Sequence, residues 1–347
     1  MRVKWKSKLI VSAMAMLLVY YTHQFTTRNE PLNLVTSVGD QVELLQVSGE
    51  THHVVYAQHE SGYLVRTFGV RDMEASEIQS IFNALTINAT SLPVGIGSLI
   101  PEAAELINYV IDDGHLTLNV SREFLEYDAA VEAQLVSSLV WSLTELEDIE
   151  RVSFQVEGHP VNNLNGTMAV GSGLTRSMGI NLEFDSNLTS INDSKLVLLY
   201  FLTDDTSNSK LVPVTRLVDA NVDPVIYAVE SLVSGPMGRG YLSVFNRNAG
   251  LVDEPILEEG LLTLNFNEGL FFNQDQTIVS SLMLVQLQNT LTSLEGIESV
   301  SVTINGSTRV FDDESNPIAV PTGGIEWQAY QETELITEFG PVYPASE

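Results

Sequence analysis

The sequence contains a long internal duplication, and this feature restricts the possible folds of the chain more than any other. The tetrapeptide Leu-Thr-Leu-Asn occurs at residues 116–119 and again at residues 262–265. A second pattern, from a Val-Ser pair to a glycine, occurs at residues 152–158 and 300–306. The copies lie 146 residues apart at the first pattern and 148 at the second. A recurrence that keeps its spacing over this length indicates two copies of one folded unit.

Hydrophobic periodicity predicts the elements of the first copy. Alternating apolar residues indicate strands, and apolar residues three or four apart indicate helices. The predicted strands are residues 53–58, 63–70, 106–111, 116–120 and 151–156, and the predicted helices are residues 77–85 and 131–146. Ser76 is a suitable N-cap for the first helix. Asp113-Gly114 lies between two strands, where this dipeptide is a strong signal for a tight hairpin.

The second copy repeats this order. Its predicted strands are residues 196–201, 211–217, 242–245, 261–266 and 299–304, and its helices open at Asp223-Pro224 and cover residues 277–294. The last helix of each copy carries an apolar stripe, formed by Val136, Leu139, Leu143 and Leu146 and by the matched Leu284, Leu287, Leu291 and Leu294. We therefore expect the same helix face to be buried in both copies.

These elements predict an α+β fold with two tandem repeats of a small domain, each a mixed sheet with helices packed on one face. We expect a signal peptide or membrane anchor (1–25), a tether (26–50), a first domain (52–162), a connector (163–193), a second domain (194–310) and an acidic C-terminal tail (311–347). The tail is interpreted as disordered or as an extended strap across a domain, with a partner-binding tail as the alternative.

The N-terminus has the pattern of a membrane-targeting segment. Four basic residues among the first eight precede an apolar run over residues 9–21, and the positive end of such a segment stays in the cytoplasm. As a helix this run spans about 20 Å, less than the ~30 Å hydrocarbon core of a bilayer. An uncleaved anchor and a cleaved signal peptide both fit, and either predicts that the remainder is exported to the outer face of the cytoplasmic membrane.

Charge and cysteine content exclude several functions. The chain has 45 acidic against 16 basic residues, a formal net charge of −29, so we expect no binding to nucleic acid. The sequence has no cysteine. Disulfides, thiolate metal sites, a cysteine nucleophile and a lipid anchor on cysteine are therefore excluded.

No motif predicts catalysis, a cofactor or a metal site. None of the six histidines has an equivalent in the second copy, and the spacing of His52, His53 and His59 is not a metal-ligand signature. The segment around Ser98 lacks the second glycine of a nucleophile elbow. Glycine-rich stretches at residues 171–173 and 235–240 do not continue as nucleotide-binding motifs.

The two copies resemble the GerM domain, the sporulation and spore-germination module. In the second copy the resemblance is carried by residues 211–216 (LVPVTR), Asp223-Pro224, residues 234–236 (SGP), residues 260–266, residues 286–292 (QLQNTLT) and residues 300–306. The first copy departs from this pattern, because it lacks the proline in its second strand and has Trp141 where the second copy has Asn289. Members of this family are often lipoproteins, which the absence of cysteine excludes here.

This resemblance implies a non-enzymatic scaffold or adaptor of the cell envelope that acts in sporulation or spore germination of a spore-forming bacterium. One possible location is the space between the mother-cell and forespore membranes. Its partners would be envelope or sporulation-complex proteins, bound through an exposed sheet edge or the polar side of the last helix. On that helix Gln286, Asn289 and Thr292 are the candidate interaction residues, with simple solvation as the alternative. A cell-wall glycan (peptidoglycan) binder or an envelope hydrolase is the rival function, and converging carboxylates in a cleft between the domains would favour it.

Overall fold

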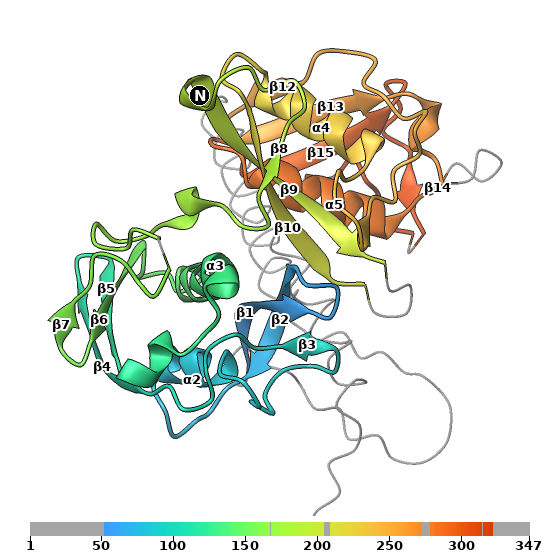
Figure 1. Cartoon of the computed structure of the whole chain (residues 1–347). Coiled ribbons are helices and arrows are strands. Elements are labelled where there is room, and N and C mark those ends of the chain that lie inside the picture. Colours follow the sequence, from blue (N-terminus) through green and yellow to red (C-terminus); the bar gives the residue numbers. More distant parts are fainter. Residues whose placement is uncertain (1–51, 167, 205–208, 273–277, 314, 322–347) are drawn as a thin grey trace, which may run out of the picture. The chain divides into compact units, whose positions relative to one another are not determined.

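The computed structural model describes residues 52–321 except 167, 205–208, 273–277 and 314 (Figure 1). The predicted membrane segment and tether lie outside these residues, as does most of the acidic tail. Among the helices that the structure describes, none is long and apolar enough to cross a membrane. The described residues belong to one compact unit.

The first repeat is coloured blue to green in Figure 1. It consists of β1 (His52–His59), β2 (Leu64–Val70), α2 (Glu77–Ala84), β3 (Ile96–Gly97), β4 (Leu106–Asp112), β5 (His115–Val120), α3 (Glu132–Leu143), β6 (Arg151–Val156) and β7 (His159–Pro160). The Ser76 side chain caps α2 by accepting a hydrogen bond from the Gln79 N–H, as its position in the sequence predicts.

The second repeat follows the connector strand β8 (Glu183–Phe184). It consists of β9 (Ser194–Thr203), β10 (Leu211–Asp219), α4 (Pro224–Ser234), β11 (Tyr241–Leu242), β12 (Ile256–Glu258), β13 (Leu261–Phe266), β14 (Ile278–Val279), α5 (Ser281–Thr292), β15 (Ser299–Ile304) and β16 (Phe311–Asp312). The Asp223 carboxylate caps α4 by accepting from the N–H groups of Val225 and Ile226. The helix therefore opens where the Asp-Pro pair predicts.

The strands of each repeat form two principal sheets, so the prediction of a single mixed sheet is wrong. In repeat one, β1 and β2 pair antiparallel, and β4-β5-β6-β7 form a separate sheet in which β5 and β6 are parallel. In repeat two, β9 and β10 pair antiparallel, and β12-β13-β15 form the separate sheet with β13 and β15 parallel. Every residue from 135 to 143 in α3 is buried. The helix α3 contacts both β1 and β6, which belong to the two different sheets. Its burial on all sides follows from this double cover.

The duplicated tetrapeptide has the same structural role in both repeats. Its leucines Leu116, Leu118, Leu262 and Leu264 lie in the two hydrophobic cores. The side-chain oxygen of Asn119 accepts a 2.7 Å hydrogen bond from the Gly158 N–H, and that of Asn265 accepts a 2.9 Å hydrogen bond from the Gly306 N–H. Both glycines have positive φ, which glycine adopts without strain. The asparagine therefore ties the central strand to the turn that ends its parallel neighbour.

Two further element predictions are corrected in the second repeat. Residues 278–279, expected to begin the last helix, form β14 and pair with β16, so α5 begins at Ser281. Of the predicted strand over residues 242–245, only Leu242 lies in a strand, the two-residue β11. Residues 311–321 pack on repeat two, where Ile318 is buried and its carbonyl accepts from the Val302 N–H at 3.3 Å. This part of the tail is a strap across the second repeat.

Asn181 in the connector joins the two repeats. Its side-chain amide donates to the carbonyl oxygens of Leu64 at 2.7 Å and Pro213 at 2.8 Å, and its side-chain oxygen accepts from the Leu64 N–H at 2.9 Å. Leu64 begins β2 of repeat one, and Pro213 lies in β10 of repeat two. The strands β2 and β10 do not pair with each other through backbone hydrogen bonds. Instead, the Asn181 side chain bonds to the backbone of both strands and so links them.

Candidate functional site

The predicted interaction surface on α5 is only partly at the surface. Gln286 is fully buried. Its side-chain oxygen accepts from the Val244 N–H at 2.9 Å, and its side-chain nitrogen donates to the carbonyl oxygens of Tyr200 and Leu242, both at 3.3 Å. These bonds satisfy the amide inside the repeat, so Gln286 cannot contact a partner. The apparent polar side of the helix is here a buried link to β9 and β11.

Asn289 and Thr292 lie on a different side of α5 and are half-buried. Each donates a hydrogen bond to its own helix, Asn289 to the Val285 carbonyl at 2.9 Å and Thr292 to the Gln288 carbonyl at 2.7 Å. Both residues line a cavity of about 1110 Å³ at the junction of the two repeats. The structure therefore separates the three predicted residues into one buried residue and two cavity residues.

The polar centre of this cavity is an arginine–glutamate pair. Arg176 of the connector forms a 2.8 Å ion pair with Glu145, and its guanidinium lies 4.9 Å from the centre of the Trp141 ring. The Tyr56 hydroxyl donates to the same Glu145 carboxylate at 2.6 Å. Burial alone would raise the pKa of Glu145, but the nearby guanidinium groups of Arg176 and Arg66 outweigh it and lower that pKa. Glu145 is therefore a charged partner of Arg176 rather than a proton donor.

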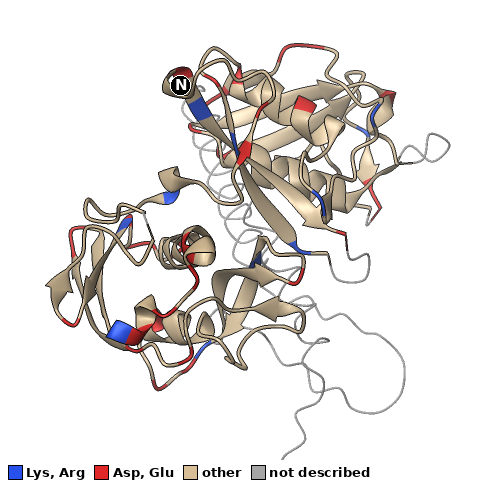
Figure 2. Ribbon diagram, in the orientation of Figure 1, with Lys and Arg blue, Asp and Glu red and all other residues tan. Residues whose placement is uncertain are grey.

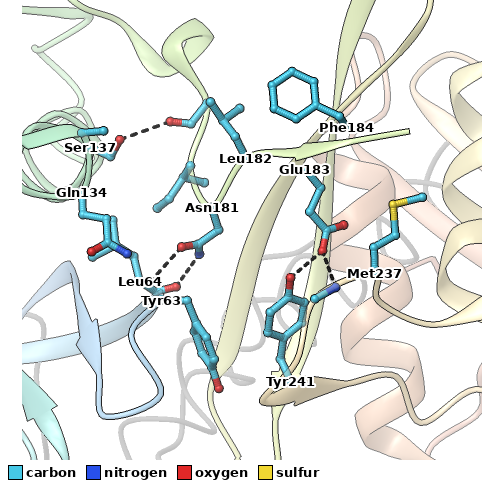
Figure 3. A pocket seen from close by; sticks show the side chains of 14 residues that line it. Tyr63, Leu64, Gln134, Ser137, Asn181, Leu182, Glu183, Phe184, Met237 and Tyr241 are labelled. Atoms are coloured by element: carbon cyan, nitrogen blue, oxygen red, sulfur yellow. Dashed lines mark hydrogen bonds between the residues drawn. The ribbon is translucent and has the colours of Figure 1, made fainter. Parts of the chain in front are cut away.

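A second cavity, of about 670 Å³, lies between Tyr63 and Gln134 of repeat one and Tyr241 of repeat two (Figure 3). Glu183 is the only acid among its lining residues. Its carboxylate accepts from the Tyr241 hydroxyl at 2.5 Å, from the Gly238 N–H at 2.8 Å and from Arg216 at 2.7 Å. Each oxygen of this carboxylate therefore has a donor within the fold, and the charged donor Arg216 makes the contact an ion pair.

The buried carboxylate Glu132 has a similar structural role. It lies at the start of α3 and accepts hydrogen bonds from the Tyr127 hydroxyl at 2.8 Å and from the N–H groups of Gly166 and Met168. These contacts fasten the beginning of the connector to the helix. Of the two cavities described above, the smaller is lined by one acid, Glu183, and the larger by three, the half-buried Glu145 and the exposed Glu295 and Glu298.

Among the residues that the structure describes, no histidine lines either cavity, although His59 stacks on a residue that lines the second one. His53 is buried against the Ser80 hydroxyl at 3.0 Å, His59 stacks on Tyr63 with ring centres 5.2 Å apart, and His115 contacts Ser153 at 2.7 Å. Among the residues that the structure describes, no three His, Cys, Asp or Glu side chains are grouped so as to hold a metal ion.

The clearest exposed feature is a pair of equivalent sheet edges. β4 and β12 are the outermost strands of their sheets, and each is unpaired on its outer side in the described part of the chain. Val110 in β4 lies opposite Thr117, and Ile256 in β12 lies opposite Thr263, the equivalent position 146 residues later. Both side chains are well exposed, at 62% and 56%. Their neighbours Ile111 and Leu257 are also equivalent and exposed.

Sequence reasoning predicted an exposed edge but did not identify these residues. The sequence did contain a signal for these residues, because an apolar side chain on an edge strand recurs at the equivalent position in both copies. A single exposed apolar residue is ordinary, whereas one that recurs in both repeats indicates a shared surface. Acidic residues are spread over both repeats with few basic residues between them (Figure 2).

Comparisons with known proteins agree with the duplicated architecture. The model of the Germane family, described as sporulation and spore germination, matches residues 31–162 and 198–310. The spore germination protein GerM of Bacillus subtilis (strain 168) is 27% identical over 290 residues, which are 81% of this chain and 79% of that protein. The solved structure of the tandem GerMN domains of the sporulation protein GerM from Bacillus subtilis superposes with a TM-score of 0.71 at 26% identity, covering 78% of this chain and 96% of that chain.

Proposed function

The chain belongs to the Germane family, and on this premise we propose that it is a non-enzymatic adaptor of the cell envelope that acts in sporulation or spore germination. Its relative in Bacillus subtilis is named a spore germination protein. In this proposal the chain is exported, is held at the outer face of the cytoplasmic membrane by its N-terminal segment, and binds other envelope or sporulation-complex proteins.

The observation that carries the proposal is the duplicated free edge formed by β4 and β12. An unpaired edge strand can extend its sheet with a strand from another protein, and exposed apolar side chains beside the edge add affinity. Proteins that avoid such pairing place charges or proline on their edges. On these edges the exposed Val110 and Ile256 are apolar, while Asp112 ends β4 and Pro255 and Glu258 flank Ile256 and Leu257 in and beside β12.

The rival reading, an envelope hydrolase or a peptidoglycan binder, has less support. Both cavities are concave, as a ligand site requires. Glu145 and Glu183 are each paired to an arginine, Arg176 and Arg216 respectively, and Arg176 helps to keep Glu145 charged, whereas a general acid must exchange a proton. The larger cavity is also lined by Glu295 and Glu298, which are exposed and are the carboxylates that the rival function would use.

A capture experiment with a sedimentation control tests the proposal. The full chain is used as bait in extracts of sporulating cells, and in parallel it is mixed with purified cell wall and pelleted. We expect specific envelope proteins to be recovered with the bait. In the sedimentation control, we expect the chain to stay in the supernatant when the wall is pelleted. Sedimentation with the wall, or release of glycan fragments, without any protein partner would transfer support to the rival function.

A further inference from the structure

The outermost strand of the first repeat, β4, is largely uncovered on both of its faces. It lies at the edge of its sheet (Figure 1). Of its seven residues only Leu106 is buried, whereas four of the six residues of the neighbouring strand β5 are buried. Apart from pairing with β5, residues 107–112 make no backbone hydrogen bond within the described part of the chain. Free backbone donors and acceptors therefore lie beside exposed apolar side chains.

A hollow of about 440 Å³ lies on one face of this strand. Tyr109 and Ile111 of β4 line it, together with the start of α2 and residues 145–149, which follow α3. Successive side chains of a strand point to opposite faces, so Val110, which does not line the hollow, lies on the other face. A strand added beside β4 would therefore place every second side chain next to the hollow.

No basic residue lines this hollow, whereas four acids do: Glu77, Glu145, Glu147 and Asp148. Glu77 is paired with Arg71 at 3.7 Å, and Glu145 is paired with Arg176 at 2.8 Å. Within the described part of the chain, no Lys or Arg nitrogen lies within 4.0 Å of the carboxylates of Glu147 and Asp148. Both residues are exposed. Two negative charges beside β4 are therefore left without an ion-pair partner.

The remainder of the first repeat does not neutralise these charges. Residues 52–162 contain 17 acids, four arginines and no lysine. The exposed Asp112 and Asp113 extend the acidic surface into the hairpin turn, and Arg122 follows the other end of the hairpin, where β5 pairs with Leu106. Because like charges opposite each other destabilise strand pairs, this edge disfavours a second copy of itself and favours a strand with basic residues.

The hollow also has the apolar surface that a long basic side chain needs. Ile111, Leu146 and Ile149 line it beside the acids. Lysine and arginine match such a surface, because their aliphatic stems pack on apolar groups while their charged ends stay in water or contact a carboxylate. The combination of apolar and acidic lining therefore fits lysine or arginine better than a purely apolar side chain.

The equivalent place in repeat two lacks this excess of negative charge. Its equivalent residues line the larger cavity described above: Leu257, Leu294, Glu295 and Ile297. Gly296 stands in place of Asp148. Three acids and three basic residues line that cavity: Glu145, Glu295, Glu298, Arg66, Arg176 and Lys195. The preference for a basic strand is therefore confined to the β4 edge.

On the premise of the proposed adaptor function, we propose that the β4 edge binds a β-strand of a partner protein whose alternate side chains are lysine or arginine. The strand extends the sheet through the free backbone groups of β4. Its basic side chains lie in the hollow beside Glu147 and Asp148, and its other side chains pack beside Val110 on the opposite face.

The test measures binding of synthetic strands to the full chain by fluorescence anisotropy, in about 0.15 M salt to screen long-range attraction. The probe is a labelled peptide of seven residues, the length of β4, that alternates lysine with threonine and valine. Two counterparts carry glutamine or glutamate in place of lysine, and a third has the sequence of residues 106–112. In a fourth, one lysine and one valine amide are N-methylated, which blocks both edges of the strand but keeps its charge. We expect saturable binding of the lysine peptide and at least tenfold weaker binding of the other four.

Two double variants then assign the site. Glu147→Gln with Asp148→Asn should weaken binding of the lysine peptide at least threefold, a modest effect because exposed ion pairs contribute little. Glu126→Gln with Asp193→Asn changes the same residue types at exposed positions outside the hollow and should leave the affinity within about 1.5-fold. All four positions are exposed, so folding is retained. An equal effect of the two double variants would show that the peptide does not bind at the hollow.

Four results with the peptides would also overturn the proposal. Equal binding of the glutamine or glutamate peptide would show that the charge of the strand is not recognised. Equal binding of the N-methylated peptide would show attraction by charge alone, without strand pairing. Tighter binding of the 106–112 peptide would make a second copy of this chain the occupant. The fourth result is the absence of saturable binding of the lysine peptide.

Capture of proteins from sporulating cells tests the adaptor function separately. If partners are captured but the lysine peptide is not preferred, the adaptor function stands and the basic strand is wrong. If no partner is captured although the lysine peptide binds as expected, the adaptor function is contradicted and the strand preference of β4 is not.

Discussion

The side chain of Thr290 in α5 accepts a 2.9 Å hydrogen bond from the backbone N–H of Tyr200 in β9. Repeat one contains the same link, since the Ser142 hydroxyl accepts from the Tyr56 N–H at 2.8 Å. One turn earlier, Gln286 donates to the Tyr200 carbonyl and Ser138 to the Tyr56 carbonyl. The polar residues on these helices therefore hold the first strand of each repeat, which explains why they are polar and yet buried.

Replacing Thr290 with valine should destabilise the second repeat. Valine has nearly the same shape, but it leaves the buried Tyr200 N–H without its partner, at a cost of about 1 to 3 kcal/mol. The measurement is the free energy of unfolding in urea. Thr292→Val is the matched control on the same helix, because the Thr292 hydroxyl bonds only to its own helix and is half-buried. Equal effects of the two substitutions would contradict the role given to Thr290.

Replacing Asn181 with aspartate should uncouple the two repeats. The shape of the side chain is kept, but an oxygen replaces the amide nitrogen that donates to the Leu64 and Pro213 carbonyls. We expect a loss of about 2 to 4 kcal/mol and two separate unfolding transitions in urea in place of one. Asn192→Asp, an exposed change in the same connector, should leave one transition. A single unshifted transition for the Asn181 variant would show that the repeats are joined by other contacts.

Stability should fall on acidification through His53. Burial, followed by the charges of Arg71 and His52, lowers the pKa of His53 from 6.5 to about 4. Between these values the unfolded chain takes up a proton that the folded chain does not, so stability is present above pH 6.5 and is lost as the pH falls toward 4. The loss assigned to this group is about 2 kcal/mol.

The variant His53→Leu isolates this contribution. Urea midpoints of the wild type and the variant are compared at pH 7.5 and pH 4.5, with His159→Leu as an exposed control. We expect the wild type and the His159 variant to lose more stability over this interval than the His53 variant. An identical loss in all three would show that His53 is not the group responsible.

Much of the fold could be predicted from local pattern. The strands β6, β13 and β15 have the predicted boundaries, the caps of α2 and α4 lie at Ser76 and Asp223, and the tandem α+β repeat is confirmed. The resemblance to the GerM domain is likewise confirmed by the family match. These features depend on residues close together in sequence, or on the comparison of one copy with the other.

The remainder depends on contacts that a local pattern does not contain. Strand periodicity does not specify which strands pair, so the division of each repeat into two sheets was missed. Residues 278–279 form a strand only because β16, far along the chain, pairs with them. Gln286 is predicted to lie at the surface because glutamine is usually exposed. It is buried because its hydrogen-bond partners Val244, Tyr200 and Leu242 lie on other parts of the chain. Asn181 is a lone connector residue, and nothing in the sequence marks it as the link between the repeats.

The adaptor proposal is tested most directly by charged substitutions on the two free edges. Capture of protein partners from sporulating cells is compared for Val110→Lys, Ile256→Lys and the double variant. The matched controls Val94→Lys and Ile191→Lys replace the same residue types at positions that are exposed but not on these edges. All five variants should stay within about 0.5 kcal/mol of the parent chain in stability, since exposed substitutions cost little. We expect at least tenfold lower capture by the double variant and unchanged capture by the controls. Full capture by the folded double variant would contradict docking through β4 and β12.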